Sequence, residues 1–280
     1  NYVQARLIKE NLVSNESADK TALLRRVTFD LTGLPPTEEE IKAFIEDESE
    51  MAYTTLVERL LNSPYYGERW ASLWMDLARY ADTKGFEKDP ERTVWPYRDW
   101  VIDAFNKNMP YDEFVIKQLA GDLLPANDFS NLVPTTFQRL SPTNDEGGTD
   151  DEEFRMLSVM DRSVTSWGVL NGLTMQCVQC HAHPYDPIRH EEYYQSLAFF
   201  NTSLDGDWAE NDYPHLFIPE DSAQTDEAYG LQKEIRELKS SLTQAGKNIA
   251  RNSKWDDLII SDAHFDPVAG IERTRCEPKP

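Results

Sequence analysis

Two cysteines and a histidine stand close together in the second half of the chain, in Cys177-Val178-Gln179-Cys180-His181. This C-x-x-C-H pattern is typical of covalent attachment of c-type haem. Residues three and four apart share one face of a helical turn, so both thiols and the imidazole can address the same flat cofactor. The pattern predicts a haem c whose vinyl groups are bonded to Cys177 and Cys180 and whose iron takes His181 as proximal ligand.

The same cysteine pair is compatible with two other kinds of site. Cys276 is the one further cysteine, which excludes a four-cysteine zinc site. A Cys2His2 or Cys3His zinc site stays open, because the chain has four more histidines: His183, His190, His215 and His264. A thioredoxin-like dithiol would need a βαβ context, which the surrounding sequence does not show. Taken alone, the five residues favour haem over zinc and over a redox dithiol.

A loop before the motif carries the oxygen ligands that calcium prefers. Its carboxylates are Asp145, Asp150, Asp151, Glu152 and Glu153. The spacing does not match an EF-hand loop, and carboxylates at 150–153 are also favoured by the dipole of the helix that begins there. We keep Asp145, Asp150, Asp151 and Glu153 as a candidate calcium site.

The charge of the chain and the motifs that it lacks argue against several classes of partner and of enzyme. The chain has 50 acidic and 28 basic residues and a formal net charge of −22, which argues against nucleic acid and against anionic membrane surfaces as partners. No apolar run approaches the roughly 18 residues that span a bilayer, so we expect a protein that is not transmembrane. No signal-peptide pattern opens the chain at Asn1, which we interpret as the start of a mature or internal fragment. Motifs of serine hydrolases, phosphate loops and zinc proteases are absent, and nothing singles out a pair of glycosidase carboxylates.

Helical periodicity dominates the first 200 residues. A capping box of Thr37 and Glu40 and prolines near two helix starts mark boundaries. One helix is expected to bury a face of large apolar side chains: Trp70, Leu73, Trp74, Leu77 and Tyr80. The expected helices cover 18–29, 37–45, 52–61, 68–81, 95–105, 111–124, a long helix through 154–164, and 190–200, with a weaker pattern at 127–140.

The pattern changes after residue 203. Residues 204–222 are polar and proline-containing, as in a linker. Apolar residues then recur at heptad-like spacing, at Leu231, Ile235, Leu238 and Leu242. Residues 255–260 alternate like a strand. We expect a mainly α protein made of a multi-helix domain at 1–203, a linker and long helix or helical hairpin at 204–251, and the start of a further, possible β domain as a short irregular or β tail at 252–280.

Several distinctive blocks of sequence are spread over about residues 1–203. The first block is LRRVTFDLTGLPPT at 24–37, a later one contains the C-x-x-C-H motif, and the last is AFFN at 198–201. The blocks are residues 24–37, 63–70, 78–82, 95–100, 118–125, 146–149, 177–187, 193–194 and 198–201. In these residues and in their order the chain resembles the planctomycete-type cytochrome c-like domain, a domain of large secreted proteins that has long been catalogued as one of unknown function.

The resemblance implies a haem domain, and it implies no substrate. His183, which the family motif shares, and Met109, in the block Asn108-Met109-Pro110-Tyr111, are candidate distal ligands. His183 starts on the wrong side of the ring because it follows the proximal ligand by two residues, and Met109 has core packing as its alternative role. The chain departs from the common C-H-D-H-K sequence at Ala182 and Pro184, and it has Tyr66 where many members have histidine.

The leading expectation is therefore electron transfer by haem c in the periplasm or at the cell surface, because bacteria attach haem c outside the cytoplasmic membrane. Expected partners are a redox protein or other cytochrome domains, and polysaccharide through the carbohydrate-binding modules that some family members carry. Two alternatives stay open. One is an oxidase or peroxidase with an open iron position that is linked to polysaccharide breakdown. The other is a haem-bearing structural subunit of a surface assembly.

Overall fold

The computed structural model describes residues 1–125, 129–144 and 146–202, the backbone of two short strands after them, and separate helical positions between 230 and 244. The chain divides into two compact units, Asn1–Leu216 and Phe217–Pro280. We describe each by itself. Expected features that lie outside the described residues are the tail at 252–280, Asp145, His215, His264 and Cys276.

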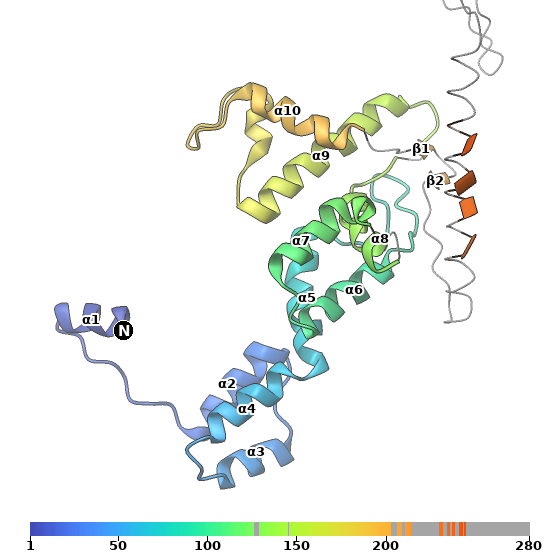
Figure 1. Ribbon diagram of the computed structural model, residues 1–280. Helices are drawn as coiled ribbons and strands as arrows, with labels where there is room; N and C mark the ends of the chain where they lie inside the picture. Colours follow the sequence, from blue (N-terminus) through green and yellow to red (C-terminus); the bar gives the residue numbers. More distant parts are fainter. Residues whose placement is uncertain are drawn as a thin grey trace, which may run out of the picture. The chain divides into compact units, whose positions relative to one another are not determined.

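The described part of the first unit is mainly helical, which confirms the expectation of a mainly α multi-helix domain (Figure 1). Its α-helices are α1 (Tyr2–Lys9), α2 (Lys20–Thr32), α3 (Glu38–Glu46), α4 (Ala52–Leu61), α5 (Pro64–Ala78), α6 (Trp95–Asn106), α7 (Tyr111–Ala120), α8 (Phe129–Leu132), α9 (Asp151–Asn171) and α10 (His190–Phe200). Short 3-10 helices are η1 (Gly121–Leu123), η2 (Val133–Arg139) and η3 (Met175–Gln179).

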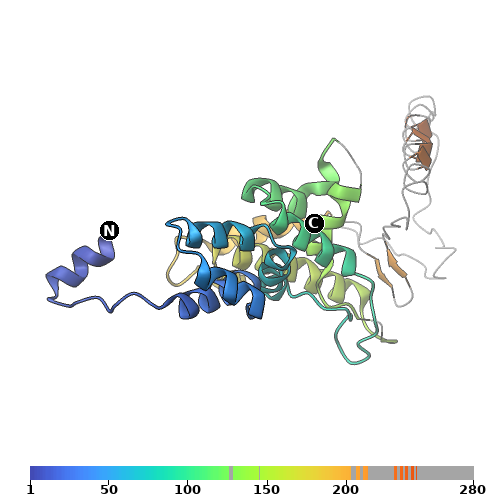
Figure 2. The same ribbon diagram turned by 90° about the horizontal axis from the view of Figure 1, so that it is seen from below.

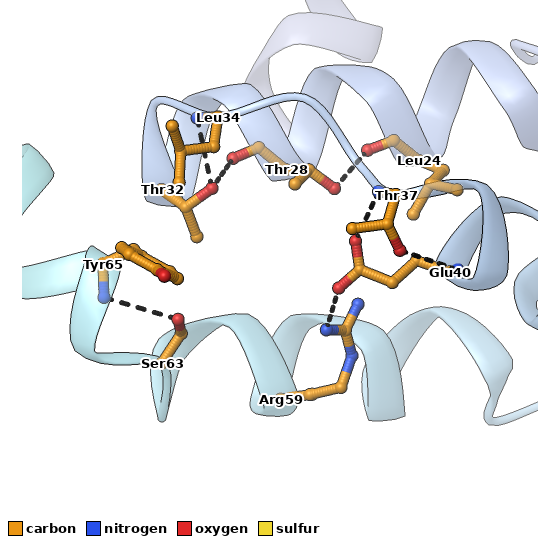
Figure 3. Close-up of polar contacts among 9 residues, drawn as sticks. All are labelled: Leu24, Thr28, Thr32, Leu34, Thr37, Glu40, Arg59, Ser63 and Tyr65. Carbon is orange, nitrogen blue, oxygen red and sulfur yellow. Dashed lines mark hydrogen bonds and ion pairs between the residues drawn. The ribbon is translucent and has the colours of Figure 1, made fainter.

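Helices α2, α3 and α4 enclose a small apolar core, and both views show them side by side (Figures 1 and 2). The core residues are Leu24, Val27, Phe44, Ala52, Leu56 and Leu60. The predicted capping box is confirmed: the Glu40 amide donates to Thr37 Oγ1 at 3.2 Å and the Thr37 amide donates to Glu40 Oε2 at 2.8 Å (Figure 3). Arg59 of α4 also donates to the Glu40 carboxylate, so one side chain both begins α3 and ties it to α4.

A second core lies between α5, α6, α7 and η2, and its residues are Ala71, Trp74, Ala78, Tyr97, Val101, Ala104, Phe114, Phe137 and Leu140. The prediction that α5 buries Trp70, Leu73 and Leu77 is wrong, because these side chains are 36%, 44% and 54% exposed. The predicted burial of Trp74 is confirmed, and the rest of the buried face of α5 consists of the small residues Gly67, Ala71 and Ala78, which let the backbones of α5 and α6 approach closely. A Cβ atom at Gly67 would lie 2.5 Å from the carbonyl oxygen of Ile102.

Polar groups inside this second core are paired. The Trp74 indole N–H lies 2.9 Å from the Tyr97 hydroxyl, which in turn donates to Gln118 Oε1 at 2.7 Å. The expected helix at 111–124 is divided: α7 ends at Ala120, and the chain continues as η1. At Gly121 the backbone lies so near that of Asn131 that a Cβ atom would be 2.0 Å from the Asn131 carbonyl oxygen, which requires glycine at this position.

Helices α9 and α10 pack together (Figure 1), and η3, which lies between them in the sequence, contacts both helices. They form a third cluster, which we call the motif cluster: Val159, Met175, Val178, Tyr193 and Leu197. An ion pair between Arg79 and Asp161 joins the end of α5 to α9. Ser141 donates to the second oxygen of Asp161 at 2.5 Å, which ties the loop after η2 to the same helix.

After α10 the backbone forms an antiparallel pair of strands, β1 (Gly206–Trp208) and β2 (Asn211–Tyr213). In the second unit, the described positions at the heptad-like spacing are helical and exposed, namely Leu231, Ile235, Leu238 and Leu242. Within the described residues, no helix is both long enough and apolar enough to cross a bilayer.

Candidate functional site

The C-x-x-C-H motif begins within η3 and ends just after it, between α9 and α10. Cys177 lies in η3 and Cys180 is the residue after its end; the Cys180 amide donates to the carbonyl oxygen of Cys177 at 3.4 Å, so one turn joins the two cysteines. Neither thiol forms a disulfide; Cys177 is half-buried and Cys180 is exposed. The Cys177 thiol donates to the carbonyl oxygen of Thr174 at 3.1 Å. That both thiols bind one haem stays a prediction.

The opposite side of η3 anchors the motif to the protein. Met175 and Val178, which are three residues apart, are both buried in the motif cluster. Two side chains of α10, four residues apart, fix the backbone of the turn. His190 Nδ1 lies 2.8 Å from the carbonyl oxygen of Val178, and the Tyr194 hydroxyl donates to the carbonyl oxygen of Gln179 at 3.0 Å. Helix α10 therefore sets the orientation of both thiols.

His181 has one ring nitrogen available to a metal. Its side chain is exposed, and its Nδ1 lies 2.7 Å from the carbonyl oxygen of Ala182. A carbonyl oxygen only accepts hydrogen bonds, so Nδ1 carries the proton and the lone pair stays on Nε2. Metal-bound histidines typically donate their other ring N–H to such a carbonyl. His181 thus has the tautomer that an iron ligand needs.

His183 has the opposite arrangement. Its side chain is only 6% exposed, and its Nδ1 accepts from the backbone amides of Asp186 at 2.8 Å and Tyr185 at 3.2 Å. In the neutral ring the proton is therefore on Nε2, and neither nitrogen has a free lone pair. These contacts give His183 a structural role in the loop that follows the motif. A role as distal ligand would require these hydrogen bonds to break.

The second distal candidate, Met109, packs against the core of α5, α6 and α7. It lines a cavity of about 300 Å³ together with Trp74, Phe105 and Phe114. Cys177, in contrast, packs against the motif cluster. The structure thus assigns Met109 and the motif to different clusters, and the distal ligand stays a prediction.

The candidate calcium residues do not converge in the described part of the chain. Asp150 caps α9, because its carboxylate accepts from the amides of Glu152 at 3.0 Å and Glu153 at 3.3 Å. Among the residues that the structure describes, no three His, Cys, Asp or Glu side chains are grouped so that they could hold a metal ion. Asp145 lies outside those residues, so calcium stays a prediction.

One buried polar residue beside the motif is not singled out by the sequence. Tyr193 is 0% exposed, and its hydroxyl has no hydrogen-bond partner among the described residues. Burial raises the pKa of this hydroxyl, and the neighbouring Tyr194 and Cys180 raise it further. The sequence shows a pair of adjacent tyrosines. It does not show which of them turns into the protein.

A family model matches residues 1–205, and its description is PSCyt2, a protein of unknown function (DUF1549). The match covers helices α1–α10 and the whole C-x-x-C-H motif. The chain belongs to this family. The motif cluster and the cysteine pair of this PSCyt2 member thus lie within the part that defines the family. A search of the curated proteins finds no match, and a search of the solved structures finds none.

Proposed function

We propose that the chain binds one haem c covalently through Cys177, Cys180 and His181, and that it transfers electrons. The observation that carries this proposal is the pair of free thiols, one turn apart, followed directly by an exposed histidine whose Nδ1 lies 2.7 Å from the carbonyl oxygen of Ala182. The planctomycete-type cytochrome resemblance supports the same function. A zinc site would need further ligands beside the thiols, and His183 has neither ring nitrogen free.

The residues that would hold the haem are fixed by neighbouring elements of the fold. A haem at the motif would be held by two thioethers and by His181 Nε2, and it would supply one-electron exchange. The chain's own residues fix the thiols through α10 and the imidazole through the Ala182 carbonyl.

Electron transfer suits the exposure of the site and the charge of the chain. Cys180 and His181 are exposed, which favours exchange with a partner protein. The net charge of −22 would speed encounter with a basic redox partner, and this effect would weaken as salt increases. The proposed location is the periplasm or the cell surface, where c-type haem is attached in bacteria.

The test is production of the full chain in a host with c-type maturation and export. We expect an intact mass increased by one haem and a pyridine haemochrome spectrum of a haem with two thioether bonds. The matched control is Cys177→Ser with Cys180→Ser, which keeps the size of both side chains and should carry no covalent haem. Wild-type protein that leaves the maturation host without covalent haem would overturn the proposal, as would stoichiometric zinc at the cysteine pair.

A further inference from the structure

An apolar stripe is exposed on the helical segment of the second unit. Its residues are helical and each is at least 50% exposed, namely Leu231, Ile235, Leu238 and Leu242. The Ser241 hydroxyl of this segment donates to the carbonyl oxygen of Glu237 at 2.9 Å, a contact between residues four apart, as in a helix. Leucine and isoleucine are usually buried, so a regular row of them on a helix indicates a surface that another segment covers.

The spacing of the stripe is that of a coiled coil. Successive residues are four, three and four apart, so leucines occupy the d positions 231 and 238, Ile235 occupies the a position between them, and Leu242 occupies the next a position. Isoleucine at a with leucine at d favours two parallel helices. The sequence continues the repeat with further apolar residues, so that it extends over three heptads, at Ala228, Ala245 and Ile249.

The charged residues beside the stripe favour an identical partner helix. Glu234 falls at a g position, and Lys239, which lies outside the described residues, falls at the following e position by its place in the sequence. In a parallel pair of helices, the g position of one helix faces the e position of the next heptad in the other, so glutamate would face lysine on both sides of the seam. In an antiparallel pair, g faces g and e faces e, and these two charges would not meet.

The net charge of the segment also permits two copies to meet there. The whole chain has 50 acidic and 28 basic residues, so two copies repel each other. Between residues 228 and 249 the acidic excess is absent, because Glu234 and Glu237 are outnumbered by basic residues, which are Lys233, Arg236, Lys239 and Lys247. The helix is therefore a part of this acidic chain at which a second copy can approach closely.

We propose that the helix at 228–249 pairs with the same helix of a second copy in a parallel two-stranded coiled coil, which makes the protein a homodimer. The apolar stripes of the two copies form the seam between the helices. Two ion pairs between Glu234 and Lys239, one on each side of the seam, fix the parallel orientation. Dimerisation through this helix is independent of the proposed haem function, and it requires no cofactor.

The first experiment measures the mass of the full chain by sedimentation equilibrium over a range of concentrations. For wild type we expect the mass to rise from that of one chain, 32.3 kDa for the polypeptide, to twice that value. Glu234→Lys places lysine opposite lysine on both sides of the seam, so the dissociation constant of the dimer should rise about tenfold or more. Glu237→Lys is the matched control, because it makes the same change of charge at a c position, outside the seam, and should leave the dissociation constant unchanged.

The second experiment tests the identity and the orientation of the partner helix. Lys239→Glu alone should also weaken the dimer, because glutamate then faces glutamate. An equimolar mixture of Glu234→Lys and Lys239→Glu should form a heterodimer, because lysine again faces glutamate on both sides of the seam. This rescue by mixing cannot arise from a hairpin within one chain.

Three results would overturn the proposal. A wild type that remains monomeric at all concentrations would show that the stripe is covered by another segment of the same chain or by a different protein. A dimer that Glu234→Lys leaves intact would show that the copies meet at another surface or in the antiparallel orientation. A mixture of the two variants that stays monomeric would exclude the pairing between Glu234 and Lys239.

Discussion

His190 Nδ1 lies 2.8 Å from the carbonyl oxygen of Val178, so the first residue of α10 holds the middle of the C-x-x-C-H turn. Val178 is fully buried, and it lies between the half-buried Cys177 and the exposed Cys180. Tyr194 adds a hydrogen bond to the next carbonyl, that of Gln179. The geometry of the cysteine pair thus depends on a helix that begins nine residues after His181 in the sequence.

Removing His190 should weaken this turn more than removing the Tyr194 hydroxyl. His190→Ala leaves a carbonyl of a buried residue without its donor, and we expect the free energy of unfolding to fall by about 1–3 kcal/mol. Tyr194→Phe removes a bond at a half-exposed side chain, and a fall of about 0.5–1.5 kcal/mol is expected. Urea unfolding of the purified proteins measures both. Two variants with wild-type stability would show that α10 does not orient the motif.

His181 and His183 should respond differently to alanine. His181→Ala removes the proximal iron ligand, so we expect a low yield of covalent haem and a changed visible spectrum in whatever is attached. His183→Ala removes the acceptor of the Asp186 and Tyr185 amides, so stability should fall by about 1–3 kcal/mol while the spectrum is unchanged. Visible spectroscopy and urea unfolding separate these effects. Conversion of His183→Ala from low spin to high spin would instead identify His183 as the distal ligand.

Much of the fold follows from local patterns in the sequence. Helix starts are specified by residues that act within one turn, and the capping box of Thr37 and Glu40 shows this directly. The face that a helix buries is harder to predict from its large residues. In α5 the small Gly67 and Ala71 are buried while the larger Trp70 and Leu73 are exposed, so an estimate based on hydrophobicity alone misplaces the buried face.

The candidate site also has one part that local sequence patterns predict and another part that they do not. The thiols and His181 are set by spacing alone, so a five-residue pattern suffices to predict them. The contacts of His190, Tyr193 and Tyr194 depend on how α10 packs against η3, and no local pattern encodes that packing. The hydrogen bonds of His183 depend on the backbone of the loop at 183–188, which brings two amides to one ring nitrogen.

Glu40 should make the stability of the α3–α4 pair depend on pH. Burial alone would raise the pKa of this carboxyl, but hydrogen bonds from Thr37 and Arg59 hold the pKa below the ordinary value of 4.5. The unfolded chain therefore binds the proton more readily. The resulting stabilisation is complete above pH 4.5 and is lost as the pH falls through the lowered value in the folded state.

Glu40→Gln should therefore be less stable than wild type by about 0.5–1 kcal/mol at pH 7, with a smaller difference at pH 3. Glu38→Gln is the matched control, because it removes one charge from the same first helical turn. Urea unfolding at both pH values gives the comparison. A difference between wild type and Glu40→Gln that is the same at pH 3 and pH 7 would contradict the assigned role of the carboxylate.

Two glycine substitutions should change stability in opposite directions. A Cβ atom at Gly67 would lie 2.5 Å from the Ile102 carbonyl oxygen and 2.6 Å from the Asn106 side chain, and the Gly67 amide also donates to Asn106 Oδ1 at 2.8 Å. Because the nearest atom belongs to the backbone of α6, the two helices must separate, and Gly67→Ala should cost about 1–3 kcal/mol. At Gly168, in α9, the nearest atom would be 3.9 Å away, an ordinary contact.

Gly168→Ala should instead stabilise the protein by up to about 1 kcal/mol, because alanine has the higher helix propensity and meets no obstacle. Thermal and urea unfolding of both variants test the pair, and each serves as control for the other because the substitution is identical. A Gly67→Ala protein as stable as Gly168→Ala would mean that α5 and α6 are not in the close contact described. That close approach is what leaves Trp70, Leu73 and Leu77 on the outer side of α5, so the same result would also remove the explanation for their exposure.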